Sequence, residues 1–86
     1  MLTGRWKRLL EAREVYTILK NLGFEARKQK GTSHEHWVPK DPKVPFRKVT
    51  VDEPKAPFGD FLVKSMARQA GVSVKAFYEA LQGTPD

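Results

Sequence analysis

The strongest constraint on the fold of this chain is a change in the spacing of its apolar residues at Gly23. Before this glycine, apolar residues recur at steps of three and four, at Leu9, Ala12, Val15, Ile18, Leu19 and Leu22. This spacing is typical of the buried face of an amphipathic helix, so we expect a helix over 9–22. A glycine directly after the last apolar position favours a left-handed helix end, which assigns that role to Gly23.

After Gly23 the pattern becomes typical of strands. Residues 24–30 alternate weakly between apolar and polar side chains, which predicts a first strand. Gly31 and Thr32 then predict a tight turn, and 33–38 predicts the second strand of a hairpin. Residues 39–45 contain three prolines and form a loop or irregular connection, and 46–51 predicts a third strand.

Alternation along these strands assigns their side chains to two faces. In the second strand Glu35 and Trp37 share a face, and we expect Trp37 to point into the core. The opposite, exposed face then receives His34, His36 and Val38. In the third strand we expect the core face to carry Val49 and Val51 and the exposed face to carry Lys48 and Thr50.

Two further helices are expected near the end of the chain. Asp60 is a suitable N-cap for a helix that ends at Gly71, and its apolar stripe consists of Leu62, Val63, Met66, Ala67 and Ala70. Ser73 then caps a short helix whose apolar side carries Val74, Phe77 and Leu81. The order helix, three strands, helix and short helix predicts an α+β fold: an antiparallel meander sheet with one face covered by helices.

The composition limits the possible functions. With 86 residues the chain is expected to form a single domain over 1–86. Its net charge is 16 − 10 = +6, which favours a phosphate-bearing partner, although ordinary small soluble domains also carry such a charge. The absence of cysteine excludes disulfides, a thiol nucleophile and thiolate zinc sites. Because no apolar run is long enough to span a bilayer, we expect a cytoplasmic protein.

The segment 28–37 contains the residue types that RNA cleavage requires. It places His34 shortly after Gly31 within a run of cations. A neutral imidazole can remove a proton from a ribose 2′-hydroxyl near neutral pH, and neighbouring cations can hold the phosphate, so neither a metal nor a cofactor is required. His34 is therefore the candidate catalytic residue. The candidate RNA-binding residues are Arg27, Lys28, Lys30, Gly31, Ser33, His36 and Lys48.

Interpretations other than RNA cleavage remain open for these residues. Taken alone, His34 is better explained as an ordinary exposed strand histidine, and the pair His34 and His36 lacks further clustered metal ligands. The spacing over 66–81 also suits a DNA-binding helix-turn-helix, although its second helix has few groups that read base edges. Asp52 and Glu53 would repel phosphate, so a catalytically inactive RNA- or protein-binding domain is a further alternative.

Three segments, 19–24, 28–34 and 66–77, together resemble the HicA family of small toxins. The resemblance covers about 12–77 and leaves 1–11 as an N-terminal extension and 82–86 as a tail. It implies a double-stranded-RNA-binding-like fold, a metal-independent mRNA interferase, an antitoxin of the HicB type and His34 as the active histidine. The chain departs from the family where Thr32 separates Gly31 from Ser33, and where Asp52 and Glu53 replace a proline- and histidine-bearing basic turn.

Overall fold

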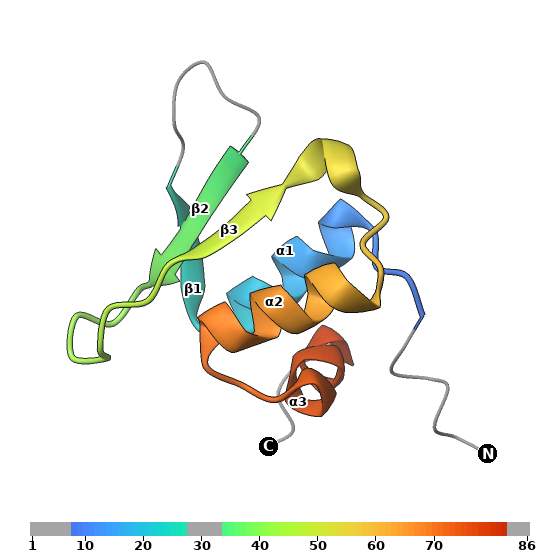
Figure 1. Cartoon of the computed structure of the whole chain (residues 1–86). Coiled ribbons are helices and arrows are strands. Elements are labelled where there is room, and N and C mark those ends of the chain that lie inside the picture. Colours follow the sequence, from blue (N-terminus) through green and yellow to red (C-terminus); the bar gives the residue numbers. More distant parts are fainter. Residues whose placement is uncertain (1–7, 28–33, 83–86) are drawn as a thin grey trace.

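The structure is a computed structural model that describes residues 8–27 and 34–82. The helices are α1 (Ala12–Asn21), α2 (Asp60–Ala70) and α3 (Val74–Glu79), with short 3-10 turns η2 (Glu53–Lys55) and η3 (Ala80–Gln82). The strands β1 (Phe24–Arg27), β2 (His34–Pro39) and β3 (Val49–Asp52) form one antiparallel sheet in the order β1-β2-β3. Helices α1, α2 and α3 lie to one side of this sheet (Figure 1). The predicted α+β fold and its order of elements are confirmed.

Helix α1 is shorter than predicted at its start. It begins after Glu11, whose backbone N–H donates to the Glu14 carboxylate at 2.9 Å. This contact closes the first turn of the helix. Leu9 therefore lies outside the helix and is 55% exposed, so its place in the predicted apolar stripe was wrong. At the other end Gly23 has φ +91°, which confirms the left-handed backbone predicted there.

The inner face of the sheet is built as predicted. Trp37, Val49 and Val51 are buried, and they pack with the apolar sides of α1 and α2 in one core. Val38 differs from the prediction: it lies on the opposite face and is nevertheless buried, outside the main core cluster.

The third strand begins three residues later than predicted, at Val49. Trp37 pairs with Val49, so in this register Phe46 would lie opposite Lys40, which is already beyond the end of β2. Phe46 therefore has no strand partner and is 73% exposed. Lys48 likewise precedes the strand and is exposed.

Helix α2 starts one residue before the position assigned from sequence, because its N-cap is Gly59 and Asp60 is its first residue. Its buried side chains are those predicted, with Leu62 only partly buried. Gly71 ends α2 with φ +82°, and Ser73 caps α3 by accepting a hydrogen bond from the Ala76 N–H at 3.0 Å. The predicted end of α2 at Gly71 and the predicted cap of α3 at Ser73 are thus confirmed, whereas the N-cap role predicted for Asp60 was wrong.

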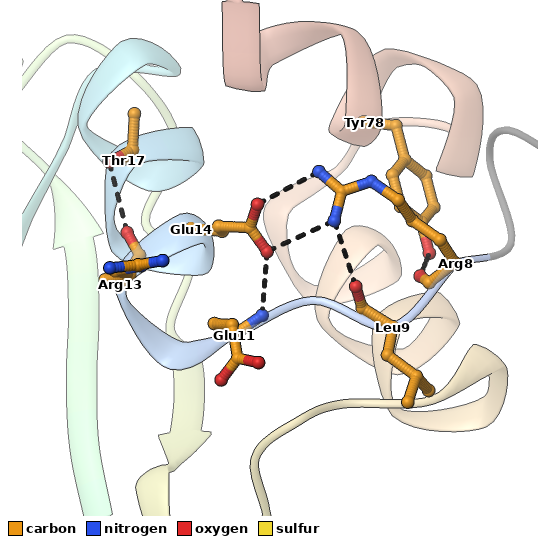
Figure 2. Close-up of polar contacts among 7 residues, drawn as sticks. All are labelled: Arg8, Leu9, Glu11, Arg13, Glu14, Thr17 and Tyr78. Atoms are coloured by element: carbon orange, nitrogen blue, oxygen red, sulfur yellow. Dashed lines mark hydrogen bonds and ion pairs between the residues drawn. The ribbon is translucent and has the colours of Figure 1, made fainter.

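Residues 8–11 are tied to three parts of the fold, and Figure 2 shows the contacts of Arg8 with Glu14 and with Tyr78. Leu10 is fully buried and exchanges two backbone hydrogen bonds with Phe58, at 3.1 and 2.7 Å. The Tyr78 hydroxyl donates to the Arg8 carbonyl at 2.7 Å, and the Arg8 guanidinium contacts both oxygens of Glu14 at 3.3 and 3.0 Å. This segment therefore fixes the start of α1 against α3 and against the loop that precedes α2.

Glu14→Ala is expected to lower the free energy of unfolding at pH 7 by about 1 kcal/mol, because it removes the acceptor for the Glu11 N–H. Hydrogen bonds from Arg8 and from the Glu11 N–H lower the pKa of Glu14 below its ordinary value of 4.5. A lowered pKa stabilises the fold above pH 4.5, and this contribution disappears as the pH falls through the folded-state value.

Urea unfolding of the wild type and of Glu14→Ala between pH 7 and pH 3 measures this difference. Glu14→Gln is the matched control, since it keeps a hydrogen-bond acceptor and cannot titrate. A difference between wild type and Glu14→Ala that stays constant down to pH 3 would contradict the assignment.

Candidate functional site

The face of the sheet opposite the helices carries both histidines. The strand register places Arg27 of β1 opposite His36 of β2, and His36 opposite Thr50 of β3. Two residues along β2, His34 lies opposite Asp52, the last residue of β3. The sheet thus gathers Arg27, His34 and His36 on one face, which for the two histidines confirms the prediction.

Backbone pairing brings the side chains of His34 and Asp52 close together. The Thr50 N–H donates to the Gln69 side-chain oxygen of α2 at 3.0 Å, so it points away from β2. The pair of His36 with Thr50 is therefore a non-hydrogen-bonded pair. Pair types alternate along an antiparallel ladder, so the pair of His34 with Asp52, two residues further along, is also non-hydrogen-bonded. In such pairs the Cα atoms are only about 4.5 Å apart and the side chains approach each other.

Three charged or titratable groups meet at this end of the sheet, and we call His34, Asp52 and Lys55 the His34 cluster. His34 Nε2 lies 3.5 Å from Asp52 Oδ2, and Lys55 Nζ of η2 lies 3.9 Å from the same oxygen. The His34 side chain is 49% exposed, whereas that of Asp52 is only 25% exposed. The imidazole is therefore accessible from solvent on a face that no helix within 8–27 and 34–82 covers.

The neighbourhood of Asp52 differs from the expectation drawn from sequence, in which its carboxylate only repels phosphate. Its oxygen contacts one imidazole and one ammonium group. A small pocket of about 80 Å³ adjoins it, lined by Thr50, Asp52, Lys55, Phe58, Leu62, Ser65 and Met66. Asp52 is thus a member of the His34 cluster, and its negative charge is offset locally by Lys55.

The opposite face of β2 is anchored by an aromatic pair and a carboxylate. The ring of Tyr16, from α1, stacks on Trp37 with a centroid distance of 5.5 Å and an interplanar angle of 19°. The Trp37 Nε1–H donates to Glu35 Oε1 at 3.2 Å. Burial, followed by the negative charges of Glu35 and Glu53, raises the pKa of Tyr16 to about 12. Sequence reasoning placed Glu35 and Trp37 on one face but did not detect Tyr16 as their partner.

The remaining predicted site residues are not all close to His34. Lys48 lies four residues before Asp52, which corresponds to about 13 Å along an extended strand. Lys28, Lys30, Gly31 and Ser33 lie outside the described residues, so their roles stay predictions. Of the aromatic side chains that could in principle stack on bases, Trp37 and Tyr78 are buried, Phe46 is exposed, and Trp6 also lies outside the described residues.

Within 8–27 and 34–82 there is no group of three or more His, Asp and Glu side chains arranged to hold a metal ion. In the same residues, the helices are too short and too polar to cross a bilayer.

A comparison with protein families gives a match over residues 12–72, to a family described as the HicA toxin of bacterial toxin-antitoxin. The chain belongs to the HicA toxin family. The matched region runs from the start of α1 to just beyond α2 and includes His34 and the other residues of its cluster. No curated protein and no solved structure gave a match. Membership supports the role of toxin in a toxin-antitoxin pair and implies an antitoxin as partner.

Tyr16→Phe is expected to make this HicA family protein less sensitive to alkaline pH. Because the pKa of Tyr16 is raised from 10.0 to about 12 in the folded state, its contribution to stability is complete below pH 10 and is lost as the pH rises toward 12. The wild type therefore loses more free energy of unfolding across this interval than the variant, which cannot ionise at this position.

Urea unfolding followed by circular dichroism at pH 8, 10 and 12 measures the two losses. Tyr78, whose pKa is also raised, is present in both proteins, so its contribution cancels in the comparison. Equal losses in the wild type and Tyr16→Phe would contradict the assignment to Tyr16.

Proposed function

We propose that this HicA family toxin is a metal-independent endoribonuclease that cleaves mRNA, with His34 as its general base and then its general acid. The observation that carries the proposal is the position of His34: a half-exposed imidazole at the end of β2, on the sheet face without helices, next to a carboxylate and an ammonium group. Imidazole suits both proton-transfer roles near neutral pH.

The proposed reaction is transfer of the phosphodiester to the neighbouring 2′-oxygen. The imidazole of His34 accepts the 2′-hydroxyl proton, the 2′-oxygen forms a bond to phosphorus, and the bond from phosphorus to the 5′-oxygen breaks. The 5′-oxygen takes up a proton as it leaves, which the imidazolium can supply. The products are a 2′,3′-cyclic phosphate and a free 5′-hydroxyl, and no electrons are transferred.

Exposed cations beyond the His34 cluster support RNA binding. Arg27 is exposed at the end of β1, and its register partner His36 lies beside His34 on β2. Lys48 is exposed about 13 Å from Asp52 along the strand direction, which suits contact with a different phosphate. The overall charge of +6 favours approach of a polyanion from a distance. The predicted contributions of Lys28, Lys30, Gly31 and Ser33 belong to this proposal.

Family membership also supports an inhibitory partner, which we infer to be a HicB-like antitoxin in the cytoplasm. A partner that covers the His34 face would have to match its cations, so an acidic surface on the antitoxin is expected.

The helix-turn-helix alternative receives less support. Helix α3 has only six residues, and two of them, Phe77 and Tyr78, are buried. Its exposed side chains are Lys75 and Glu79, which leaves a small surface for reading base edges.

His34→Ala is expected to reduce cleavage of single-stranded RNA by roughly 10² to 10⁴-fold in the presence of a chelator, because it removes the proton acceptor. The variant is expected to fold, since the His34 side chain is 49% exposed. Gel analysis of labelled RNA measures the rate, and mapping of the ends tests for 2′,3′-cyclic phosphate. Circular dichroism verifies the fold of the variant.

Growth on induction gives a second measurement, with arrest expected for the wild type and relief for His34→Ala. Full cleavage by His34→Ala would disprove its catalytic role. If the wild type binds RNA or antitoxin but cuts no RNA, the protein is the inactive binding domain considered as an alternative. Duplex-DNA binding that depends on Lys75 and is indifferent to His34 would favour the helix-turn-helix.

A further inference from the structure

We propose that Asp52 is a positioning residue for His34: its carboxylate accepts the Nε2–H of the imidazole and so fixes the tautomer and the orientation of the ring. The inference rests on the proposed function, because it names the group that orients the imidazole for the reaction. It also gives a role to the Asp52 carboxylate, which the sequence analysis expected only to repel phosphate.

The first argument is the backbone geometry. His34 and Asp52 are register partners in a non-hydrogen-bonded pair, so the strands themselves hold the two side chains next to each other. The distance from Nε2 to Oδ2 is 3.5 Å. Hydrogen bonds of catalytic groups are often long in free enzymes and shorten when the substrate binds, so this distance suits a contact that tightens on RNA.

The second argument concerns the tautomer. A carboxylate can only accept hydrogen bonds, so the imidazole nitrogen that faces Asp52 is the one that carries the proton in the neutral ring. The other nitrogen, Nδ1, then holds the lone pair. A general base needs a ring in the correct tautomer and orientation, and the contact with Asp52 fixes both.

The third argument is the local charge. Lys55 Nζ lies 3.9 Å from the same Oδ2 that faces His34. The positive charge of the ammonium group partly cancels the negative charge that Asp52 presents to an approaching phosphate. The site therefore gains a hydrogen-bond acceptor that orients His34, without a large net negative charge. Asp52 is the N-cap residue of η2, but its side chain makes no capping hydrogen bond there, and its replacement is not expected to unfold the turn.

Glu53 provides a matched control. It is the next residue along the chain, carries the same charge and is exposed. No ion pair or hydrogen bond is found between Glu53 and His34 in the described part of the chain, whereas Asp52 contacts the imidazole directly. A change at Glu53 alters the charge of the region to the same extent as a change at Asp52 but leaves the positioning contact in place.

The first test needs no RNA. Two-bond ¹⁵N–¹H NMR spectra distinguish the tautomers of neutral histidine, and the chain has two histidines, so His36 is an internal reference. We expect the Nε2–H tautomer for His34 in the wild type and in Glu53→Gln, and a larger Nδ1–H population in Asp52→Asn and Asp52→Ala. A predominant Nδ1–H tautomer in the wild type, or spectra unchanged by both Asp52 variants, would overturn the inference.

The second test measures cleavage. Asp52→Asn is expected to lower kcat by about 10- to 100-fold with little change in KM, which is the scale of the effect for residues that orient metal-ligating histidines. Asp52→Glu, which restores a carboxylate, is expected to recover part of the rate, and Glu53→Gln is expected not to lower kcat. In a His34→Ala background, Asp52→Asn should cause no further loss, because the two residues act as one unit.

The outcomes separate this inference from the proposed function. Tighter RNA binding and undiminished kcat in Asp52→Asn would show that the carboxylate only repels phosphate, and the inference would be wrong while catalysis by His34 still stood. If the wild type cuts no RNA, the proposed function fails, and the NMR spectra still decide whether Asp52 holds the imidazole.

Discussion

The burial of Trp37 is the constraint on which the arrangement of the site depends. Because side chains alternate along a strand, an inward Trp37 requires an inward Glu35 and an outward His34 and His36. The stack with Tyr16 and the hydrogen bond to Glu35 keep the Trp37 side chain on the inner face of the sheet. A slip of one residue in the register would bury His34 and expose Trp37, so the core of the protein and the exposure of its candidate base are specified by the same contacts.

The segment that carries Lys55 is fixed by interactions at both of its ends. It follows β3 directly, and a few residues later Phe58 exchanges two hydrogen bonds with Leu10. Leu10 precedes the region that matches the HicA family, and α3, whose Tyr78 binds the Arg8 carbonyl, follows it. Parts of the chain outside the family match therefore help to hold one member of the His34 cluster in place.

Periodicity was sufficient to predict the order of elements, the inner faces of β2 and β3, and the buried side of α2, because each depends only on local spacing. It failed where an element begins: Leu9 has apolar character but precedes the turn closed by Glu14, and Phe46 has strand character but no partner. The contact between His34 and Asp52 could not be predicted, because it depends on the register of β2 with β3 across an irregular loop rich in proline. From the sequence alone, without that register, Asp52 can be interpreted only as a negative charge near the phosphate site.

Magnitudes explain how a carboxylate can be favourable in a site for a polyanion. Two unit charges 4 Å apart interact by about 1 kcal/mol in bulk water and by about 4 kcal/mol near a protein surface, and salt reduces the interaction of exposed groups. The Asp52 side chain is 25% exposed, so its repulsion of a phosphate lies between these two values, and Lys55, 3.9 Å from the same oxygen, offsets part of it. A positioned general base contributes roughly 10² to 10⁴-fold to the rate, and most of that depends on correct geometry and protonation. The proposed orientation of His34 by Asp52 contributes a share of this factor and acts against the loss in binding. The replacement of a basic turn by Asp52 is then compatible with an active RNA-cleaving toxin.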